Sequence, residues 1–131
     1  MSGTSVTIRA LTPDARIFGA EPAGADDAAR SLEAGEFLPQ TGPDTICDGL
    51  LTSMGEHTWP IIRDHLETII RVTDEQVVEA MRLILDNLGM VVEPSGAASL
   101  AAVLTPEFKE LKGIDRVGVI LTGGNVDSLP F

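Results

Sequence analysis

The segment Asp74–Leu88 constrains the fold more than any other part of this 131-residue chain. Large apolar side chains recur there at the spacing of one helix face, namely Val77, Met81, Ile84, Leu85 and Leu88. Thr73 and Gln76 have capping-box spacing and Gly89 follows the last apolar position, so both helix ends are marked. Burying these side chains contributes about 10 kcal/mol, whereas ordering the backbone of the segment costs at least about 15 kcal/mol. The helix therefore cannot stand alone and must pack against other elements.

Short apolar runs are the expected partners of this helix. Ile69–Val72 and Val117–Leu121 are aliphatic runs typical of strands buried in parallel sheets, and Arg16–Ala20 is a third run of strand length. Between the first two lies Ser95–Leu104, a predicted helix of small residues that suits close packing. This alternation predicts an α/β fold with a mostly parallel sheet and covering helices.

Weaker patterns predict three more helices, at Gly3–Ala10, Ala25–Ala34 and Trp59–Leu66. Gly35 stands where a glycine ends the second of these. Residues 36–55 are rich in Pro, Gly, Thr and Asp and are expected to be mostly loop. The length fits one domain, so we expect residues 1–131 to form a single unit.

Composition narrows the classes of partner. The chain has 9 Lys and Arg against 20 Asp and Glu, a formal net charge of −11, which argues against nucleic acid or an anionic membrane. No apolar run approaches the ~20 residues needed to cross a bilayer, and the first residues lack the apolar core of a signal peptide. Cys47 is the single cysteine, which favours a reducing compartment. We therefore expect a cytoplasmic protein.

The run Val119–Leu121 leads directly into Thr122 and two glycines, Gly123 and Gly124. In open α/β sheets, ligands bind at the carboxyl ends of strands, and glycines let the backbone approach them. Thr122 would place a hydroxyl within reach of a heterocyclic nitrogen. A plain strand-ending turn explains the same residues.

Acidic residues at two helix starts also have two explanations each. Glu93 precedes a helix that Ser95 could cap, so it either faces a ligand or is a solvated residue beside a cap. Glu21, Asp26 and Asp27 surround a strand-to-helix turn whose carbonyls could complete an oxygen shell around a hard divalent cation. Alternatively, these acids only favour the positive end of the helix dipole.

Four segments, taken in order and with their spacing, resemble the C-terminal part of the serine/threonine dehydratases and serine racemases. They are TICDG at 45–49, TWPIIRD at 58–64, EPSGA at 93–97 and TGGNVD at 122–127. These enzymes use pyridoxal phosphate and have fold type II, and the resemblance extends from about Gly3 to Asp127. It implies that residues 1–131 form part of the large domain of such an enzyme, without its N-terminal part and small domain.

The resemblance also implies cofactor contacts. Thr122 matches the position whose hydroxyl bonds the pyridine nitrogen of pyridoxal phosphate, where the family more often has Ser. Glu93 matches a carboxylate of the pocket, Gly49 matches a glycine whose backbone lines the cofactor, and Gly123 lies beside Thr122 in the same loop. A neutral hydroxyl does not hold the ring nitrogen protonated, which suits β-elimination or racemisation of hydroxy-amino acids.

A metal site is implied in the same way. Glu21, the carbonyl of Ala25, and Asp27 match the divalent-cation ligands of serine racemases, and two carboxylates with one carbonyl suit Mg²⁺ or another divalent cation. The pair Asp26-Asp27 favours the racemase branch over the biosynthetic threonine dehydratases.

The family's Schiff-base lysine and its glycine-rich phosphate loop have no counterpart in this sequence, so we assign no catalytic residue here. Two functions stay open. The chain is a fragment of a dehydratase (ammonia-lyase) or racemase acting on an amino-acid substrate, inactive by itself. Alternatively, it is a non-catalytic divalent-cation-binding module, or the docking half of a split enzyme with a separate N-terminal half. Apolar surface left uncovered by missing structure also predicts a homo-oligomer.

Overall fold

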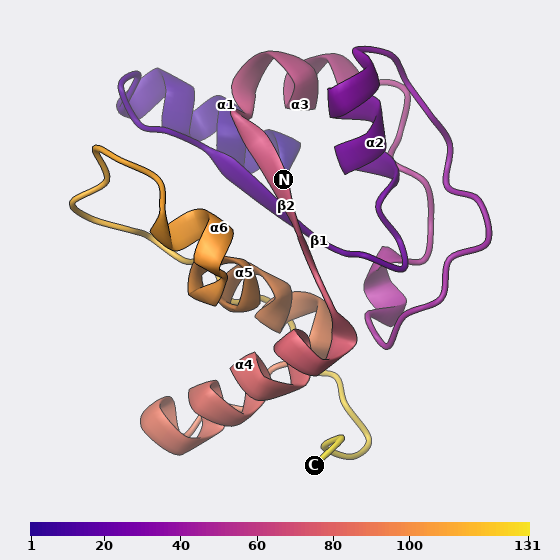
Figure 1. The fold of residues 1–131 in the computed structure, drawn as a ribbon, viewed down its shortest axis with the longest axis vertical. Helices are drawn as coiled ribbons and strands as arrows, with labels where there is room; N and C mark the ends of the chain where they lie inside the picture. The colour runs from indigo at the N-terminus through magenta and orange to yellow at the C-terminus, as the bar shows by residue number, and fades with distance from the viewer.

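The computed structural model describes residues 1–131 as six α-helices, two strands and one 3₁₀ turn (Figure 1). In chain order these are α1 (Ser2–Leu11), β1 (Phe18–Pro22), α2 (Asp27–Ala34), the 3₁₀ turn η1 (Asp48–Leu50), α3 (Trp59–His65), β2 (Thr68–Val72), α4 (Asp74–Leu88), α5 (Pro94–Leu104) and α6 (Pro106–Lys109).

The sheet is parallel and has two strands. β1 pairs with β2 in a register that sets Phe18 opposite Thr68 and Pro22 opposite Val72. Because side chains alternate along a strand, Ile70 and Val72 belong to one buried cluster and Ile69 to another. The two faces of the sheet thus have separate cores, as the predicted α/β class with covering helices requires.

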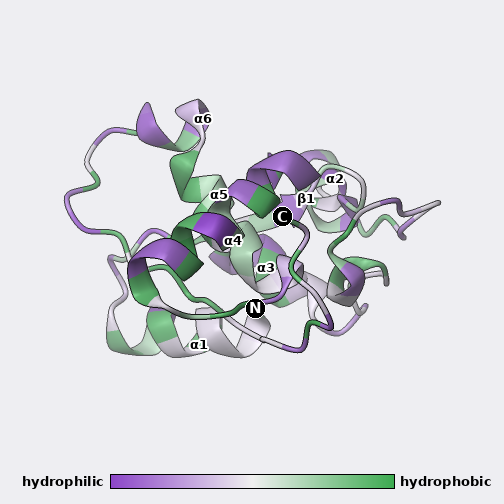
Figure 2. Cartoon of the chain, turned by 90° about the horizontal axis from the view of Figure 1, so that it is seen from below, coloured by the Kyte–Doolittle hydropathy of each residue, from purple (hydrophilic) through white to green (hydrophobic).

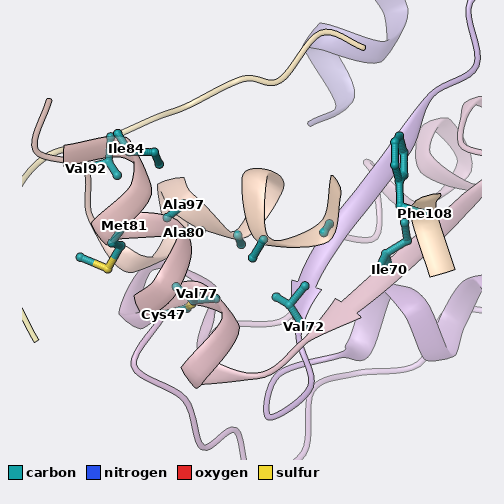
Figure 3. Close-up of a cluster of buried hydrophobic side chains, with 13 residues drawn as sticks. Cys47, Ile70, Val72, Val77, Ala80, Met81, Ile84, Val92, Ala97 and Phe108 are labelled. Carbon is teal, nitrogen blue, oxygen red and sulfur yellow. The ribbon is translucent and has the colours of Figure 1, made fainter. Parts of the chain in front are cut away.

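One face of the sheet is covered by α5, with α4 packed on the far side of α5 (Figure 3). Small residues of α5 allow this close packing, and they are buried at Ala97, Ala98, Ala101 and Ala102. The two helices differ in hydropathy (Figure 2). Hydrophobic green or pale residues run along the whole of α5, whereas α4 alternates between hydrophobic green and hydrophilic purple. α4 therefore has an apolar face toward α5 and a polar face toward solvent, as its periodicity predicts, except that Leu88 at its end is 59% exposed.

The other face is covered by α1, α2 and α3. Its core contains Ile17 and Ile69 from the sheet region together with residues of α2, of α3 and of the C-cap of α3, which are Ala28, Ala29, Ile62 and Leu66. Ile8 of α1 packs against this cluster. The sheet is thus enclosed between two helical layers.

The predicted helix ends of α4 are confirmed. Gln76 N donates to Thr73 Oγ1 at 3.3 Å and Thr73 N donates to Gln76 Oε1 at 2.9 Å, which is a complete capping box. Gly89 ends the helix with φ of 63°, and Gly35 ends α2 with φ of 73°. No helix of the structure is long and apolar enough to span a bilayer.

The predicted strand at Val117–Leu121 is wrong. This segment has no strand partner, because β1 and β2 bond only to each other. An apolar run acquires strand structure only when a neighbour satisfies its backbone groups. The start of α2 and the bounds of β1 differ from the prediction by two residues, and α6 was not predicted. α6 begins where Thr105 Oγ1 accepts a hydrogen bond from Phe108 N.

Candidate functional site

Three loops converge at the N-terminal end of α5 and bring Gly49, Glu93, Thr122 and Gly123 together. Gly49 N donates to Ser95 Oγ at 3.1 Å, and Glu93 N donates to Gly123 O at 3.2 Å. The four predicted cofactor-binding positions thus form one cluster, although they are separated by more than seventy residues in the sequence. The roles predicted for them stay predictions.

Thr122 is fixed by an unusually close approach to Gly96. A Cβ atom on Gly96 would lie 1.6 Å from the carbonyl oxygen of Thr122, so no side chain can stand there. Thr122 is exposed, and its hydroxyl makes no hydrogen bond within the chain. Its backbone is therefore held in place while its hydroxyl is free to bind a ligand.

Glu93 lies against the loop that follows Thr122. Its Oε2 accepts a hydrogen bond from Asn125 N at 3.4 Å, and its side chain is half-buried. Gly123 has φ of 69°, and a Cβ atom there would fall 2.2 Å from Glu93 Cδ. Glycine is required at 123 both for its conformation and to leave room for the carboxylate.

The prediction that Ser95 caps α5 is wrong. The helix begins at Pro94, one residue earlier, and its N-cap Glu93 makes no side-chain capping bond. The Ser95 hydroxyl turns instead toward η1 and accepts the hydrogen bond from Gly49 N. Ser95 is a residue of the site that the sequence pattern did not identify, because a hydroxyl at a helix start is most simply explained as a cap.

The loop that carries Gly49 is fastened to the first turn of α4. Thr45 Oγ1 donates to Asp74 Oδ1 at 2.5 Å, and Ile46 N donates to Asp74 Oδ2 at 3.0 Å. Cys47, in the same loop, is 0% exposed, and its burial raises the pKa of the thiol to about 11. No local sequence signal indicated this role for Asp74, since its partners lie far away in the chain.

A cavity of about 690 Å³ opens beside the cluster. At one end it is lined by Leu50, Ser95, Gly96, Ser99 and Thr122, and from there it extends along β1 and residues 113–120. The free hydroxyl of Thr122 thus stands at the polar end of a volume large enough for a small ligand.

The predicted cation ligands also lie close together, at the turn between β1 and α2. Glu21 accepts hydrogen bonds from Ala29 N at 2.8 Å and Ala28 N at 3.4 Å. The pKa of Glu21 is raised to about 7, because burial and, to a smaller extent, the charge of Asp27 outweigh the opposing hydrogen bond from Ala29 N. Asp27 is 2% exposed and accepts from Met54 N at 2.7 Å and from Gln40 Nε2 at 3.5 Å.

Asp26, the third acid of this turn, points elsewhere. It pairs with Arg30 at 2.9 Å and Arg71 at 2.7 Å. Burial disfavours its charged form, but the hydrogen bonds from the two arginines outweigh this and lower the pKa of Asp26. The side chains of Glu21 and Asp27 are joined by no third His, Cys, Asp or Glu in a metal-binding group. The metal site predicted from the resemblance stays a prediction, in which carbonyl oxygens or water would have to supply the further ligands.

Residues 1–123 match the protein family described as pyridoxal-phosphate dependent enzyme. Serine racemase of Dictyostelium discoideum is 46% identical over 129 residues, which cover 97% of this chain and 40% of that protein. The beta-hydroxyaspartate dehydratase of Paracoccus denitrificans is 44% identical over 128 residues, with 97% and 40% covered. The solved structure of maize serine racemase superposes with a TM-score of 0.93 at 43% identity, over 96% of this chain and 39% of that one.

The chain thus spans about 40% of the length of the curated relatives that it matches, in their C-terminal part. The family match covers most of the chain, and the parallel sheet with its helical layers superposes on the corresponding part of maize serine racemase. The chain belongs to the pyridoxal-phosphate dependent enzyme family.

Proposed function

We propose that this chain forms one wall of the active site of an enzyme that uses pyridoxal phosphate to eliminate water from, or racemise, hydroxy-amino acids. The observation that carries the proposal is the position of Thr122. Its backbone is locked against Gly96, its hydroxyl is unpaired, and it stands at the polar end of the large cavity. The relatives named above as serine racemase and beta-hydroxyaspartate dehydratase support the substrate class.

The donor set of this wall fits the cofactor. Thr122 would bond the ring nitrogen through its hydroxyl, Gly49 would offer its backbone to the ring edge, and the half-buried Glu93 would hold a carboxylate at the pocket wall. Gly123 would keep the space that Glu93 occupies. When bound, pyridoxal phosphate supplies the electron sink for the α-carbon of the amino acid. A neutral hydroxyl at the ring nitrogen limits that sink, which favours elimination and racemisation.

We further propose that the isolated chain is inactive. Its two lysines, Lys109 and Lys112, are exposed at and just after α6, at the opposite end of α5 from Thr122. Neither can reach a substrate held beside Thr122. The lysine that binds the cofactor and moves the α-proton would come from polypeptide equivalent to the N-terminal part of the relatives. The purified chain with pyridoxal phosphate should release neither ammonia nor keto acid from L-serine or L-threonine and should form no D-serine.

A chimera tests the role of Thr122 directly. This chain replaces the matching C-terminal region of the Dictyostelium discoideum enzyme, and activity with L-serine, L-threonine and 3-hydroxyaspartate is measured. We expect elimination or racemisation with at least one substrate. Thr122→Ala should lower kcat roughly tenfold or more, whereas Thr122→Ser should retain most activity. A folded chimera that binds pyridoxal phosphate but acts on none of the three substrates would contradict the proposal.

A second candidate function is divalent-cation binding, with Glu21, the carbonyl of Ala25 and Asp27 as ligands. Glu21 and Asp27 are close enough for one charge to raise the pKa of the other, and neither is paired with a basic side chain. Their present partners are N–H groups, and a carboxylate has lone pairs left for a cation. The plain alternative is that Glu21 only caps the start of α2 through Ala28 and Ala29. Thermal melting with and without Mg²⁺, on the parent chain, Asp27→Asn and Asp26→Asn, separates cation binding from simple capping of α2.

We also propose a cytoplasmic location and a homo-oligomer for the complete protein. The single buried Cys47 supports a reducing compartment. Exposed apolar side chains around the end of α4 support self-association; these are Leu88, Met90, Val91 and Leu104.

A further inference from the structure

Ser99, in the second turn of α5, makes a hydrogen bond that leaves its own helix. Its Oγ donates to Ile120 O at 2.7 Å, across 21 positions of the sequence. A serine inside a helix commonly bonds a carbonyl of the preceding turn instead. Here the acceptor of that kind, Gly96 O, is 3.5 Å away, at the limit for a hydrogen bond. The Ser99 hydroxyl is therefore directed to the segment that follows α6 and passes behind α5 in Figure 1.

This hydrogen bond lies beside the close approach of Thr122 to Gly96. Gly96 and Ser99 are three positions apart in α5, so they lie on one face of the helix. That face holds Ile120 through the serine hydroxyl, and it holds Thr122 through the carbonyl that fills the space of a Cβ atom on Gly96. Beyond Thr122, the carbonyl of Gly123 accepts from the N–H of the N-cap of α5. The backbone on both sides of Thr122 is thus fixed to α5.

Of these three anchors, only the one at Ser99 uses a side chain. The anchor at Gly96 requires that a side chain be absent, and the anchor at Gly123 is a bond between two backbone groups. The buried neighbours of Ser99 in α5 are alanines, which form helices better than serine does. An alanine at position 99 would thus keep the helix but leave Ile120 O without its donor. Ser99 also lines the cavity on the same side as Thr122.

We propose that Ser99 is a positioning residue for Thr122. By holding Ile120 O, it fixes the backbone two residues before Thr122 and so sets the direction of the Thr122 hydroxyl toward the ligand. A hydrogen bond weakens steeply as its angle departs from linear, so a small turn of this backbone changes how well that hydroxyl can donate. Ser99 acts through Thr122 and need not touch the cofactor. This proposal rests on the proposed function, which makes the ring nitrogen of pyridoxal phosphate the acceptor.

The first measurement needs no cofactor. Backbone amide NMR spectra of the free 131-residue chain are compared for the parent, Ser99→Ala and Ser99→Thr. Ser99→Ala should shift the amide signals of residues 119–124, whereas Ser99→Thr keeps a hydroxyl and should restore the parent signals. Thr7→Ala is the matched control, because Thr7 Oγ1 donates to Gly3 O at 2.9 Å in α1 and Thr7 does not line the cavity. It should leave the signals of residues 119–124 unchanged.

The second measurement uses the chimera, loaded with pyridoxal phosphate that carries the NMR-active nitrogen isotope in its ring. The chemical shift of that nitrogen reports its hydrogen bond. Ser99→Ala should move this shift part of the way to its value in Thr122→Ala, and it should lower kcat roughly threefold to tenfold with less effect on KM. The double variant Ser99→Ala/Thr122→Ala should have the same shift and the same kcat as Thr122→Ala alone, because Ser99 acts only through Thr122.

The outcomes separate this inference from the proposed function. If Thr122→Ala moved the ring-nitrogen shift but Ser99→Ala did not, the role of Ser99 would be overturned and the proposed function would stand. Additive losses in the double variant would also overturn it, since Ser99 would then act on the fold and not through Thr122. If Thr122→Ala itself left the shift unchanged, the ring nitrogen would not be the acceptor, and the roles of both residues would be overturned.

Discussion

Asp74 accepts the hydrogen bond of the Thr45 hydroxyl at 2.5 Å, across 29 positions of the sequence. The same carboxylate accepts from Ile46 N. One side chain in the first turn of α4 thus fixes the loop that presents Gly49 to the site.

Replacing Asp74 should loosen this loop. Asp74→Ala removes the acceptor of two hydrogen bonds, one from the half-buried Thr45 hydroxyl and one from the exposed Ile46 N–H, at a cost of about 2 kcal/mol in the free energy of unfolding. Glu75→Ala is the matched control, because Glu75 is an exposed acid in the same helical turn. Urea denaturation of both variants measures the difference. If both variants lost the same free energy of unfolding, Asp74 would act only through its favourable charge at the start of the helix.

Gly96→Ala should displace Thr122. The new methyl group would coincide with the carbonyl of Thr122, so the backbone of residues 121–123 must move. We expect a loss of roughly 2 kcal/mol or more in stability, and weaker cofactor binding in the chimera. Gly3→Ala is the control, because nothing lies within 4 Å of a Cβ atom on Gly3 in α1. That substitution should be neutral or slightly stabilising. A Gly96→Ala protein as stable as the parent would show that the approach of Thr122 is not rigid.

Glu21 should make the chain less stable as the pH rises toward neutrality. Its pKa in the folded chain, about 7, lies above the ordinary value of 4.5, so folding favours the protonated form. Its contribution to stability is complete below about pH 4.5 and is lost as the pH passes through about 7. The loss is at most roughly 3 kcal/mol. Glu21→Gln should remove this part of the pH dependence.

The measurement is the free energy of unfolding of parent and variant between pH 4.5 and 8. Glu36→Gln, which removes one exposed acid, is the control for net charge. Other acids change the stability in the opposite direction as the pH rises, because their pKa values are lowered; these are Asp26, Glu33 and Glu67. Only the difference in the free energy of unfolding between parent and variant therefore isolates the effect of Glu21. If the free energy of unfolding depended on pH in the same way in the parent and in Glu21→Gln, the prediction would be contradicted.

Mg²⁺ should raise the melting temperature of the chain by several degrees. A cation that binds only the folded state, at a concentration a hundred times its dissociation constant, raises the free energy of unfolding by about 2.7 kcal/mol. Asp27→Asn should abolish the shift, whereas Asp26→Asn should retain it, because Asp26 pairs with arginines instead. An equal shift in parent and Asp27→Asn would exclude Asp27 as a ligand. No shift in either would leave the acids as partners of the helix dipole alone.

Signals confined to a few neighbouring residues predicted their structures well. Thr73, Gln76 and Gly89 lie within one helix and its two caps, so the sequence alone contains every group in those interactions. The order of the helices and the parallel direction of the sheet followed from the same local patterns, whereas the pairing of β1 with β2 alone did not.

Interactions between segments far apart in the chain were harder to predict from the sequence. The apolar pattern of Val117–Leu121 reports that these side chains avoid water, but strand structure requires a neighbouring backbone, and the sequence does not show whether one is present. Ser95 had two possible partners, the start of its own helix or Gly49, and the spacing of hydroxyls and helices does not decide between them. The convergence of Gly49, Glu93 and Thr122 was accessible only through the family resemblance.

The burial of Cys47 gives the chain an internal reporter. It belongs to the loop that Asp74 fastens and is fully buried, and at a pKa of about 11 almost none of its thiol is thiolate at neutral pH. A thiol-specific alkylating reagent can therefore modify it only when the loop lifts. Because no other cysteine competes, the rate of that single modification measures how often the Gly49 wall of the pocket opens.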